Sequence, residues 1–101
     1  MDAGKKSSPM ASNDAFGIDE LTSGQMRAAR ALLQWDQKTL AERSKVSLAT
    51  IKRLEPLAGP IRANRVTIDA LRRAFESAGI QFLPENGGGA GVRLAKRSDQ
   101  S

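Results

Sequence analysis

The chain has 101 residues, enough for one small domain with tails. It contains no cysteine and no histidine, so disulfides, thiolate catalysis and imidazole metal sites are excluded. No apolar run reaches the roughly 18 residues of a membrane-spanning helix. Lys and Arg number 16 against 11 Asp and Glu, and the resulting charge of +5 favours an anionic partner, nucleic acid before a membrane surface.

Residues 1–20 are rich in small and polar residues without a sustained period, which predicts a disordered tail. Lys5 and Lys6 could touch DNA phosphates as an arm would, but a solubilising tail is the simpler interpretation. No apolar segment follows them that would form a secretory signal, so we expect a cytoplasmic, nucleoid-associated protein with no membrane partner.

The first helix is predicted to begin at Thr22. Thr22 and Gln25 have the spacing of a capping box, and Leu21 and Met26 that of a hydrophobic staple. Trp35, between this helix and the next, indicates core packing more than a platform for a base. Further along the helix, apolar residues recur at helical spacing and basic ones lie on the other side: Met26, Ala29, Leu32 and Leu33 against Arg27 and Arg30.

The segment 36–55 predicts two short helices joined by a tight turn. Asp36 is suited to cap the first helix, which runs to about Ser44, and Ser47 to cap the second. The second helix ends at Glu55 because Pro56 follows. Five apolar side chains are spaced to face a common core, namely Leu40, Ala41, Val46, Ile51 and Leu54.

That spacing leaves Leu48, Ala49, Lys52 and Arg53 on the outer side of the second helix. A short capped helix that exposes small apolar and basic residues is suited to recognise DNA in the major groove. Apolar groups there can contact thymine methyls, and the two cations can donate to guanine or to phosphate.

The same segment resembles the helix-turn-helix DNA-binding domains of the Cro/C1 (XRE) type. The matching positions are Gln37, Leu40-Ala41, Val46-Ser47, Thr50-Ile51 and Glu55, and with its flanking helices the resemblance covers roughly residues 21–78. The family commonly has glycine where this chain has Lys45. If Lys45 takes a left-handed conformation, lysine costs about 1 kcal/mol relative to glycine.

The resemblance implies a mainly α, four- to five-helix, lambda-repressor-like domain over residues 21–79. The residue pattern adds a short β segment at 80–94, with possible dimerisation, and disordered tails. The resemblance also implies that Gln37 reaches the DNA backbone and that Glu55 is structural. Hydroxyls of Ser47 and Thr50 are further candidates for phosphate contacts. The expected function is a sequence-specific transcriptional regulator, acting as a homodimer on an inverted repeat of double-stranded DNA.

Residues 56–66 are predicted to form a loop that carries Arg62 and Arg65, both candidates for phosphate contacts. The next helix is expected to begin at Thr67, with Asp69 in its first turn, and to end before Gly79.

After Gly79 the period changes to that of a strand. Residues 80–83 and 92–94 alternate, and a glycine-rich turn separates them, which predicts a small hairpin. A lone two-stranded ribbon is marginal in water. It would be stabilised either by packing on the helices or by pairing with a second copy in a symmetric dimer. Residues 95–101 are expected to be a disordered polar tail.

No catalytic residue, metal ligand or cofactor site is predicted. The cluster at Gly87–Gly91 lacks the Lys-Ser or Lys-Thr of a phosphate-binding loop, and the scattered carboxylates form no cage for a hard cation. The alternative to a regulator is a protein-interaction module, such as an antitoxin or an anti-activator, with a protein partner.

Overall fold

The structure, a computed structural model, describes residues 20–85 and 87–95. The predicted tails lie outside these ranges except for Glu20 and Ala95, and so do the expected DNA contacts of Lys5 and Lys6. The described part is a small, mainly helical domain with a short β segment, as predicted. Its elements are α2 (Ser23–Leu33), α3 (Gln37–Ser44), α4 (Leu48–Leu54), α5 (Arg65–Ser77), β2 (Ile80–Leu83) and β3 (Gly91–Leu94).

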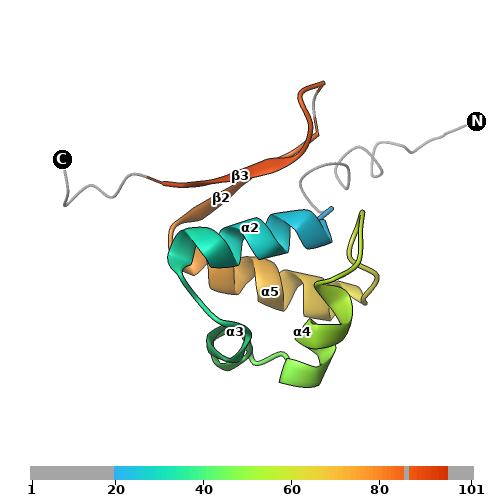
Figure 1. Ribbon diagram of the computed structural model, residues 1–101, viewed down its shortest axis with the longest axis vertical. Helices are drawn as coiled ribbons and strands as arrows, with labels where there is room; N and C mark the ends of the chain where they lie inside the picture. The colour runs from blue at the N-terminus through green and yellow to red at the C-terminus, as the bar shows by residue number, and fades with distance from the viewer. Residues whose placement is uncertain (1–19, 86, 96–101) are drawn as a thin grey trace, which may run out of the picture.

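Figure 1 shows three tiers along the long axis of the view. The hairpin of β2 and β3 lies at one end, α2 and α5 form the middle, and α3 and α4 lie at the other end. The core fills the space between these tiers and is almost entirely aliphatic. Its buried members are Leu21, Met26, Ala29, Leu40, Ile51, Leu54, Ile61, Leu71, Phe75 and Ile80.

The start of α2 has the predicted capping box. The Thr22 hydroxyl accepts from the backbone N–H of Gln25, and the Gln25 side chain accepts from the backbone N–H of Thr22, both at 3.0 Å. Leu21 and Met26, the predicted staple, are both buried. Leu32 was expected on the apolar side of the helix with the core residues. It lies outside the core instead, and 44% of it is exposed.

The start of α5 differs from the prediction. Asn64, not Thr67, is the N-cap, and its side chain accepts from the backbone N–H of Thr67 at 2.8 Å. Asparagine caps at least as well as threonine, so the helix begins earlier and Arg65 lies in its first turn rather than in the loop. Asp69 is therefore too far along α5 to interact with the helix dipole, and it forms an ion pair with Arg72 at 2.9 Å.

The predicted hairpin is confirmed, with β2 and β3 antiparallel and Phe82 opposite Val92. Of the two stabilising arrangements left open, packing on the helices occurs within the chain: β3 lies against α2, and β2 against α5. Ile80 is buried, and the Phe82 ring meets Phe75 edge-on with centroids 5.9 Å apart.

Gln25 fastens the hairpin to the helices. Its amide nitrogen donates to the backbone oxygens of Gly91, at 2.9 Å, and Leu83, at 3.3 Å. The same side chain that completes the cap of α2 therefore holds both strands at the end of the hairpin next to its turn.

Among the described residues, no helix is long and apolar enough to cross a membrane.

Candidate nucleic-acid interface

Helices α3 and α4, with the turn between them, form the α3–α4 unit. Each helix begins directly after the capping residue that the sequence predicts. Asp36 caps α3 by accepting from the backbone N–H of Thr39 at 2.7 Å. Ser47 caps α4 by accepting from the backbone N–H of Thr50 at 3.1 Å. Both caps satisfy backbone donors that would otherwise be unpaired at a helix start, so the two short helices have defined ends.

The turn between these helices depends on Lys45, which adopts the left-handed conformation with φ of 67°. Its backbone N–H donates to Ala41 O at 2.9 Å and closes α3. The buried Ser44 hydroxyl then accepts from the backbone N–H of Val46 at 3.1 Å. Lysine thus occupies a geometry that glycine adopts without a steric penalty.

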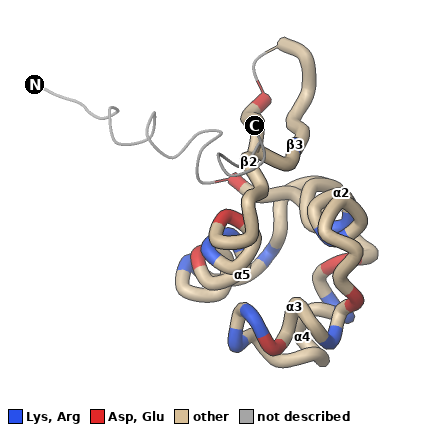
Figure 2. The backbone as a smooth tube through the Cα atoms, turned by 90° about the vertical axis from the view of Figure 1, so that its left-hand side faces the viewer, with Lys and Arg blue, Asp and Glu red and all other residues tan. Residues whose placement is uncertain are grey.

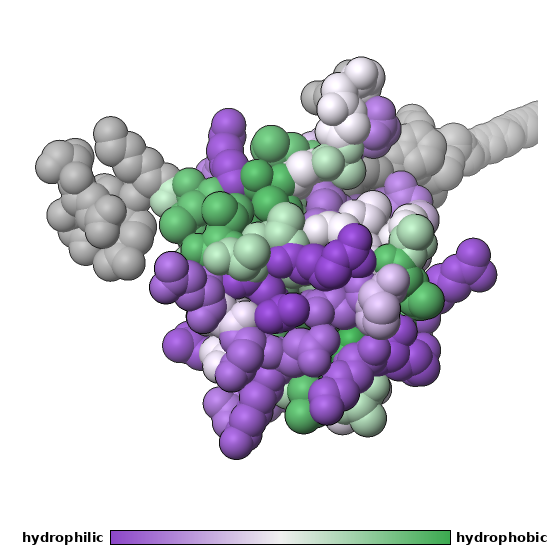
Figure 3. Space-filling view, viewed as in Figure 1, coloured by the Kyte–Doolittle hydropathy of each residue, from purple (hydrophilic) through white to green (hydrophobic). Residues whose placement is uncertain are grey.

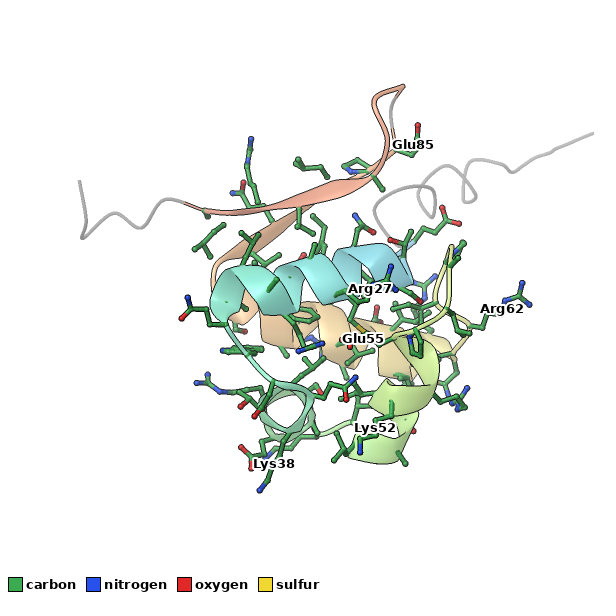
Figure 4. All side chains as sticks on the ribbon, in the orientation of Figure 1. Arg27, Lys38, Lys52, Glu55, Arg62 and Glu85 are labelled. Atoms are coloured by element: carbon green, nitrogen blue, oxygen red, sulfur yellow. The ribbon has the colours of Figure 1, made fainter. Side chains whose placement is uncertain are left out.

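The outer side of α4 is open to solvent. Ala49, Lys52 and Arg53 are exposed, whereas Leu48 is half-buried. Figure 4 shows Lys52 projecting from α4 at the end of the molecule farthest from the hairpin. Basic positions also mark α3 and α4 in the tube view of Figure 2. The small apolar and basic residues expected together are therefore accessible together.

The two hydroxyls at the start of α4 differ in what they can offer a ligand. The Ser47 hydroxyl donates to Thr50 Oγ1 at 2.9 Å while it accepts the capping bond. Its single proton is therefore not available to a ligand. The Thr50 hydroxyl accepts from Ser47 and keeps its own proton. Thr50, half-buried at the helix surface, is therefore the better donor to a phosphate oxygen.

At the C-terminal end of α4, a buried carboxylate joins three elements. Glu55, only 3% exposed, follows α4 and accepts two hydrogen bonds from the Arg30 guanidinium of α2, at 2.6 and 2.7 Å. Gln37, the first residue of α3, donates to the same carboxylate at 2.8 Å. Arg30 also donates to Trp35 O at 2.8 Å. The structural role expected for Glu55 is thus accounted for by these bonds.

Burial alone would raise the pKa of Glu55, because it disfavours the charged form. The hydrogen bonds from Arg30 and then Gln37, together with the charges of Arg30 and Arg27, outweigh that effect and hold the pKa below its ordinary value. The hydrogen bond to Glu55 correspondingly raises the pKa of Arg30. The pair is therefore fully ionised at neutral pH.

Gln37 lies half-buried at the start of α3, with one amide hydrogen committed to Glu55. The amide nitrogen carries a second hydrogen. That hydrogen can serve a phosphate oxygen while the first bond fixes the orientation of the side chain. The position of Gln37 in the sequence suggested the phosphate contact but not the anchoring carboxylate.

The two arginines assigned to the loop are both exposed, but they lie on different elements. Arg62 projects from the 55–64 loop away from the body of the domain, as Figure 4 shows. Arg65 is in the first turn of α5 and has an interaction within the chain. Lys38, which the sequence interpretation omitted, is exposed on α3 next to Gln37. Adjacent residues do not share a face of a helix, so the position of Gln37 gave no indication of Lys38.

Arg27 is a second residue whose role the sequence did not indicate. Its guanidinium donates to the backbone oxygens of Glu55, at 2.6 Å, and Leu57, at 3.1 Å. The first bond satisfies the carbonyl of the C-cap residue of α4, which the helix leaves unpaired, and the second satisfies a carbonyl in the turn that follows. Arg27 and Arg30 lie on the side of α2 away from its apolar residues, as predicted, and from there both hold α4 against α2.

Among the described residues, no group of His, Cys, Asp or Glu could hold a metal ion. The chain matches no protein-family model and no curated protein sequence.

Proposed function

We propose that the chain is a sequence-specific transcriptional regulator that binds double-stranded DNA through α4. In this proposal the α2–α5 unit is a lambda-repressor-like helix-turn-helix domain. The observation that supports it most directly is the joint exposure of Ala49, Lys52 and Arg53 on a short capped helix at the end of the molecule. That end lies opposite the hairpin, so the chain's own β segment does not cover it.

The proposed base contacts follow from the chemistry of these side chains. Leu48 and Ala49, in the first turn of α4, can pack against thymine methyls in the major groove. Lys52 and Arg53, one turn later, can donate to guanine O6 and N7. Arginine is the stronger candidate for a specific contact, because its planar guanidinium can form two parallel hydrogen bonds to guanine.

The proposed phosphate contacts flank the groove and set the orientation of the domain. Gln37 and Thr50 each have a hydrogen-bond donor to offer, and Arg62 adds a cation beyond the end of α4. Such contacts position a protein on the duplex without selecting a sequence. The net charge of +5 supports this electrostatic component.

A homodimer on an inverted repeat suits a domain of this size. A helix of seven residues contacts only a few base pairs, and a second copy doubles the number of specific contacts. Two-fold symmetry would place the half-sites one helical turn apart, about 34 Å centre to centre.

The decisive experiment is the selection of bound duplexes from a random DNA library by the full chain. We expect enrichment of an inverted repeat. On the selected site, Arg53→Ala should weaken binding by about 1–3 kcal/mol and relax the preference at one position in each half-site. The matched control is Arg73→Ala, which removes an exposed arginine from the middle of α5 and should leave both affinity and preference unchanged.

The second candidate is a protein-interaction module. The observation that favours it is the exposure of two large apolar side chains, Leu32 on α2 at 44% and Leu94 on β3 at 47%. If the library yields no enriched sequence, and a protein co-purifies with the chain instead, the regulator proposal is wrong and this alternative replaces it.

A further inference from the structure

An open cavity lies between the C-terminal end of α3 and the side of α5 that packs beside it. Its volume is about 190 Å³, and small or polar residues of both helices line it: Arg43, Ser44, Ala70, Arg73, Ala74 and Ser77. The residues from α5 follow one another at helical spacing and therefore share one side of that helix. Because two of them are alanines, they leave the space between the helices unfilled. We call this space the α3–α5 cavity.

The two arginines of the α3–α5 cavity have no acidic partner. Within the part of the chain that the structure describes, the arginines that form neither a hydrogen bond nor an ion pair are Arg43, Arg53, Arg62 and Arg73. Arg53 and Arg62 are the cations assigned to DNA above. The other two come from different helices and line one cavity. Two guanidiniums placed in this way can hold an oxyanion together, since each offers paired hydrogen bonds to phosphate or carboxylate oxygens.

Nearby carboxylates do not neutralise these arginines. Glu42 and Glu76 are exposed, but among the described residues neither forms an ion pair with Arg43 or Arg73. Glu76 lines a separate hollow, which borders the α3–α5 cavity at Arg73. The lining of the α3–α5 cavity therefore carries two positive charges and no negative one.

Trp35 holds Arg43 at the cavity. The Arg43 guanidinium lies 5.1 Å from the centre of the Trp35 ring, and that ring stacks on Phe75 of α5. A cation–π contact uses the flat face of the guanidinium and leaves its N–H groups unused. The donors of Arg43 are thus positioned by the core and remain available to a ligand.

Ser44 adds a buried donor to the cavity. It is 6% exposed, and its hydroxyl oxygen accepts from the backbone N–H of Val46 at 3.1 Å. Within the described residues, the hydroxyl proton of Ser44 has no acceptor. Most buried polar groups are fully hydrogen-bonded, so this proton indicates a missing partner. An oxygen of a bound anion would supply it.

The size and surroundings of the α3–α5 cavity favour a small, polar ligand. In the space-filling view of Figure 3, hydrophilic side chains cover the end of the molecule that α3 and α4 form, whereas apolar ones gather over α2 and the hairpin. The volume of about 190 Å³ is below the roughly 300–1,000 Å³ of sites for drug-sized molecules.

Two positive charges and a hydroxyl donor match a phosphate dianion. A phosphate monoester carries about −1.5 to −2 charges and has three terminal oxygens. A carboxylate, or a phosphodiester of the DNA backbone, carries a single charge and has two such oxygens.

We propose that the α3–α5 cavity binds a small ligand that contains a phosphate dianion, either free or as a monoester. Arg43 and Arg73 donate to its oxygens, and Ser44 donates to one of them. The site goes beyond the proposed function, because it contains no residue of the proposed DNA-binding surface and requires no DNA.

The test is calorimetric titration of the full chain without DNA, at constant ionic strength and at a pH where phosphate is a dianion. Inorganic phosphate and glycerol 3-phosphate are the probes, and dimethyl phosphate, a diester with one charge, is the comparison. We expect one site with a dissociation constant on the order of 1 mM for phosphate, which so small a ligand can reach. Dimethyl phosphate should bind at least about 10-fold more weakly. Equal binding of the diester would overturn the proposed ligand class.

Two substitutions and a matched control test the residues. Arg43→Gln and Arg73→Gln should each raise the dissociation constant by about 10-fold or more, because each removes charged hydrogen bonds to the ligand. Arg93→Gln removes the same charge from an exposed arginine of β3, at the other end of the molecule, and should leave binding unchanged. Equal losses in all three variants would show general attraction to positive charge and overturn the proposal. Circular dichroism checks that each variant is folded.

Amide NMR spectra locate the site. Added phosphate should shift the amide signals of residues 43–46 and 70–77 along one saturation curve. Shifts confined to α4 and the 55–64 loop, or no binding of either probe, would overturn the proposal.

The outcomes keep the cavity apart from the proposed function. Phosphate binding by a chain that selects no DNA sequence supports the cavity and contradicts the regulator. If a selected duplex displaces phosphate, Arg43 and Arg73 belong to the DNA-binding surface, and the separate site is wrong while the regulator stands.

Discussion

Arg30 and Glu55 are 25 residues apart, yet they form a two-point ion pair, with Arg30 Nε 2.6 Å from Glu55 Oε2 and Nη2 2.7 Å from Oε1. The side chain of Glu55 is 4% exposed and that of Arg30 is 23% exposed. Because Gln37 shares the carboxylate, this pair fixes α2, the start of α3 and the end of α4 relative to one another. The position of the candidate DNA-binding helix thus depends on a contact far from its exposed side.

Removing one partner of this pair should be strongly destabilising. We expect Arg30→Met to lower the free energy of unfolding by about 3 kcal/mol, because it leaves a buried carboxylate without its cation. The double variant Arg30→Met/Glu55→Met should recover most of that loss, since no unpaired charge remains. Urea denaturation of the wild type, both single variants and the double variant measures the coupling energy between Arg30 and Glu55. If the loss in the double variant equals the sum of the two single losses, the two residues do not stabilise each other and the prediction is wrong.

The same pair predicts how stability depends on pH. The pKa of Glu55 is lower in the folded chain than its ordinary value, so the unfolded state binds a proton more readily. Its contribution is complete above the unfolded value, about pH 4.3, and is lost as the pH falls through the lower folded value. Urea midpoints between neutral and acidic pH should fall less steeply for the double variant. Asp36, whose pKa is lowered mainly by the hydrogen bond from Thr39 and least by the charge of Arg30, contributes to both slopes.

Lys45→Gly should stabilise the domain. Lys45 has φ of 67°, and the left-handed conformation costs a non-glycine residue about 1 kcal/mol more than glycine. We therefore expect a gain of about 1 kcal/mol in thermal or urea unfolding. Lys45→Ala removes the same charge but keeps the steric penalty, so it should give no comparable gain. An equal gain from both substitutions would assign the effect to charge instead.

Gln25→Glu should loosen the hairpin while the α3–α4 unit stays folded. Glutamate can still accept the bond from the backbone N–H of Thr22, but it cannot donate to Gly91 O or Leu83 O and would place a negative charge beside them. Hydrogen exchange should become faster for amides in residues 80–94 and stay unchanged in α3 and α4. Thr22→Ala is the control, because it removes the cap of α2 and keeps the amide donors.

Binding to DNA should weaken steeply as salt increases. Each neutralised phosphate adds about 0.9 to the slope of log affinity against log salt. Arg62→Ala should lower that slope by about 1 and weaken specific and random duplexes equally, if Arg62 contacts only phosphate. Titrations at several salt concentrations with both duplexes measure this. A loss confined to the specific duplex would assign Arg62 to a base contact.

The sequence was informative wherever a structure is set by neighbours a few residues apart. The caps at Thr22, Asp36 and Ser47 were predicted correctly, because each is a side chain that accepts from a backbone N–H three residues later. The start of α5 was wrong because Asn64 and Thr67 are both good caps, and local preference alone did not distinguish them.

Contacts between distant residues were the part that the sequence could not predict. The hydrogen bonds of Gln25 to the hairpin span 58 and 66 residues, and no local pattern encodes them. Helical spacing predicted the outer positions of α4, and three of them, Ala49, Lys52 and Arg53, are exposed, whereas Leu48 is half-buried. The contacts of Arg27 and Arg30 with the end of α4 were not predicted, because the position of a residue on one helix does not show which other helix packs beside it.

Trp35 is the single tryptophan of the chain, and its ring stacks on Phe75 with centroids 5.8 Å apart. Phe75 in turn meets Phe82 of the hairpin edge-on, and the Arg43 guanidinium lies 5.1 Å from the centre of the indole. The molecule therefore carries one intrinsic fluorophore at the junction of its helices, in contact with the ring that supports the strands. Its emission can report undocking of the hairpin without any added label.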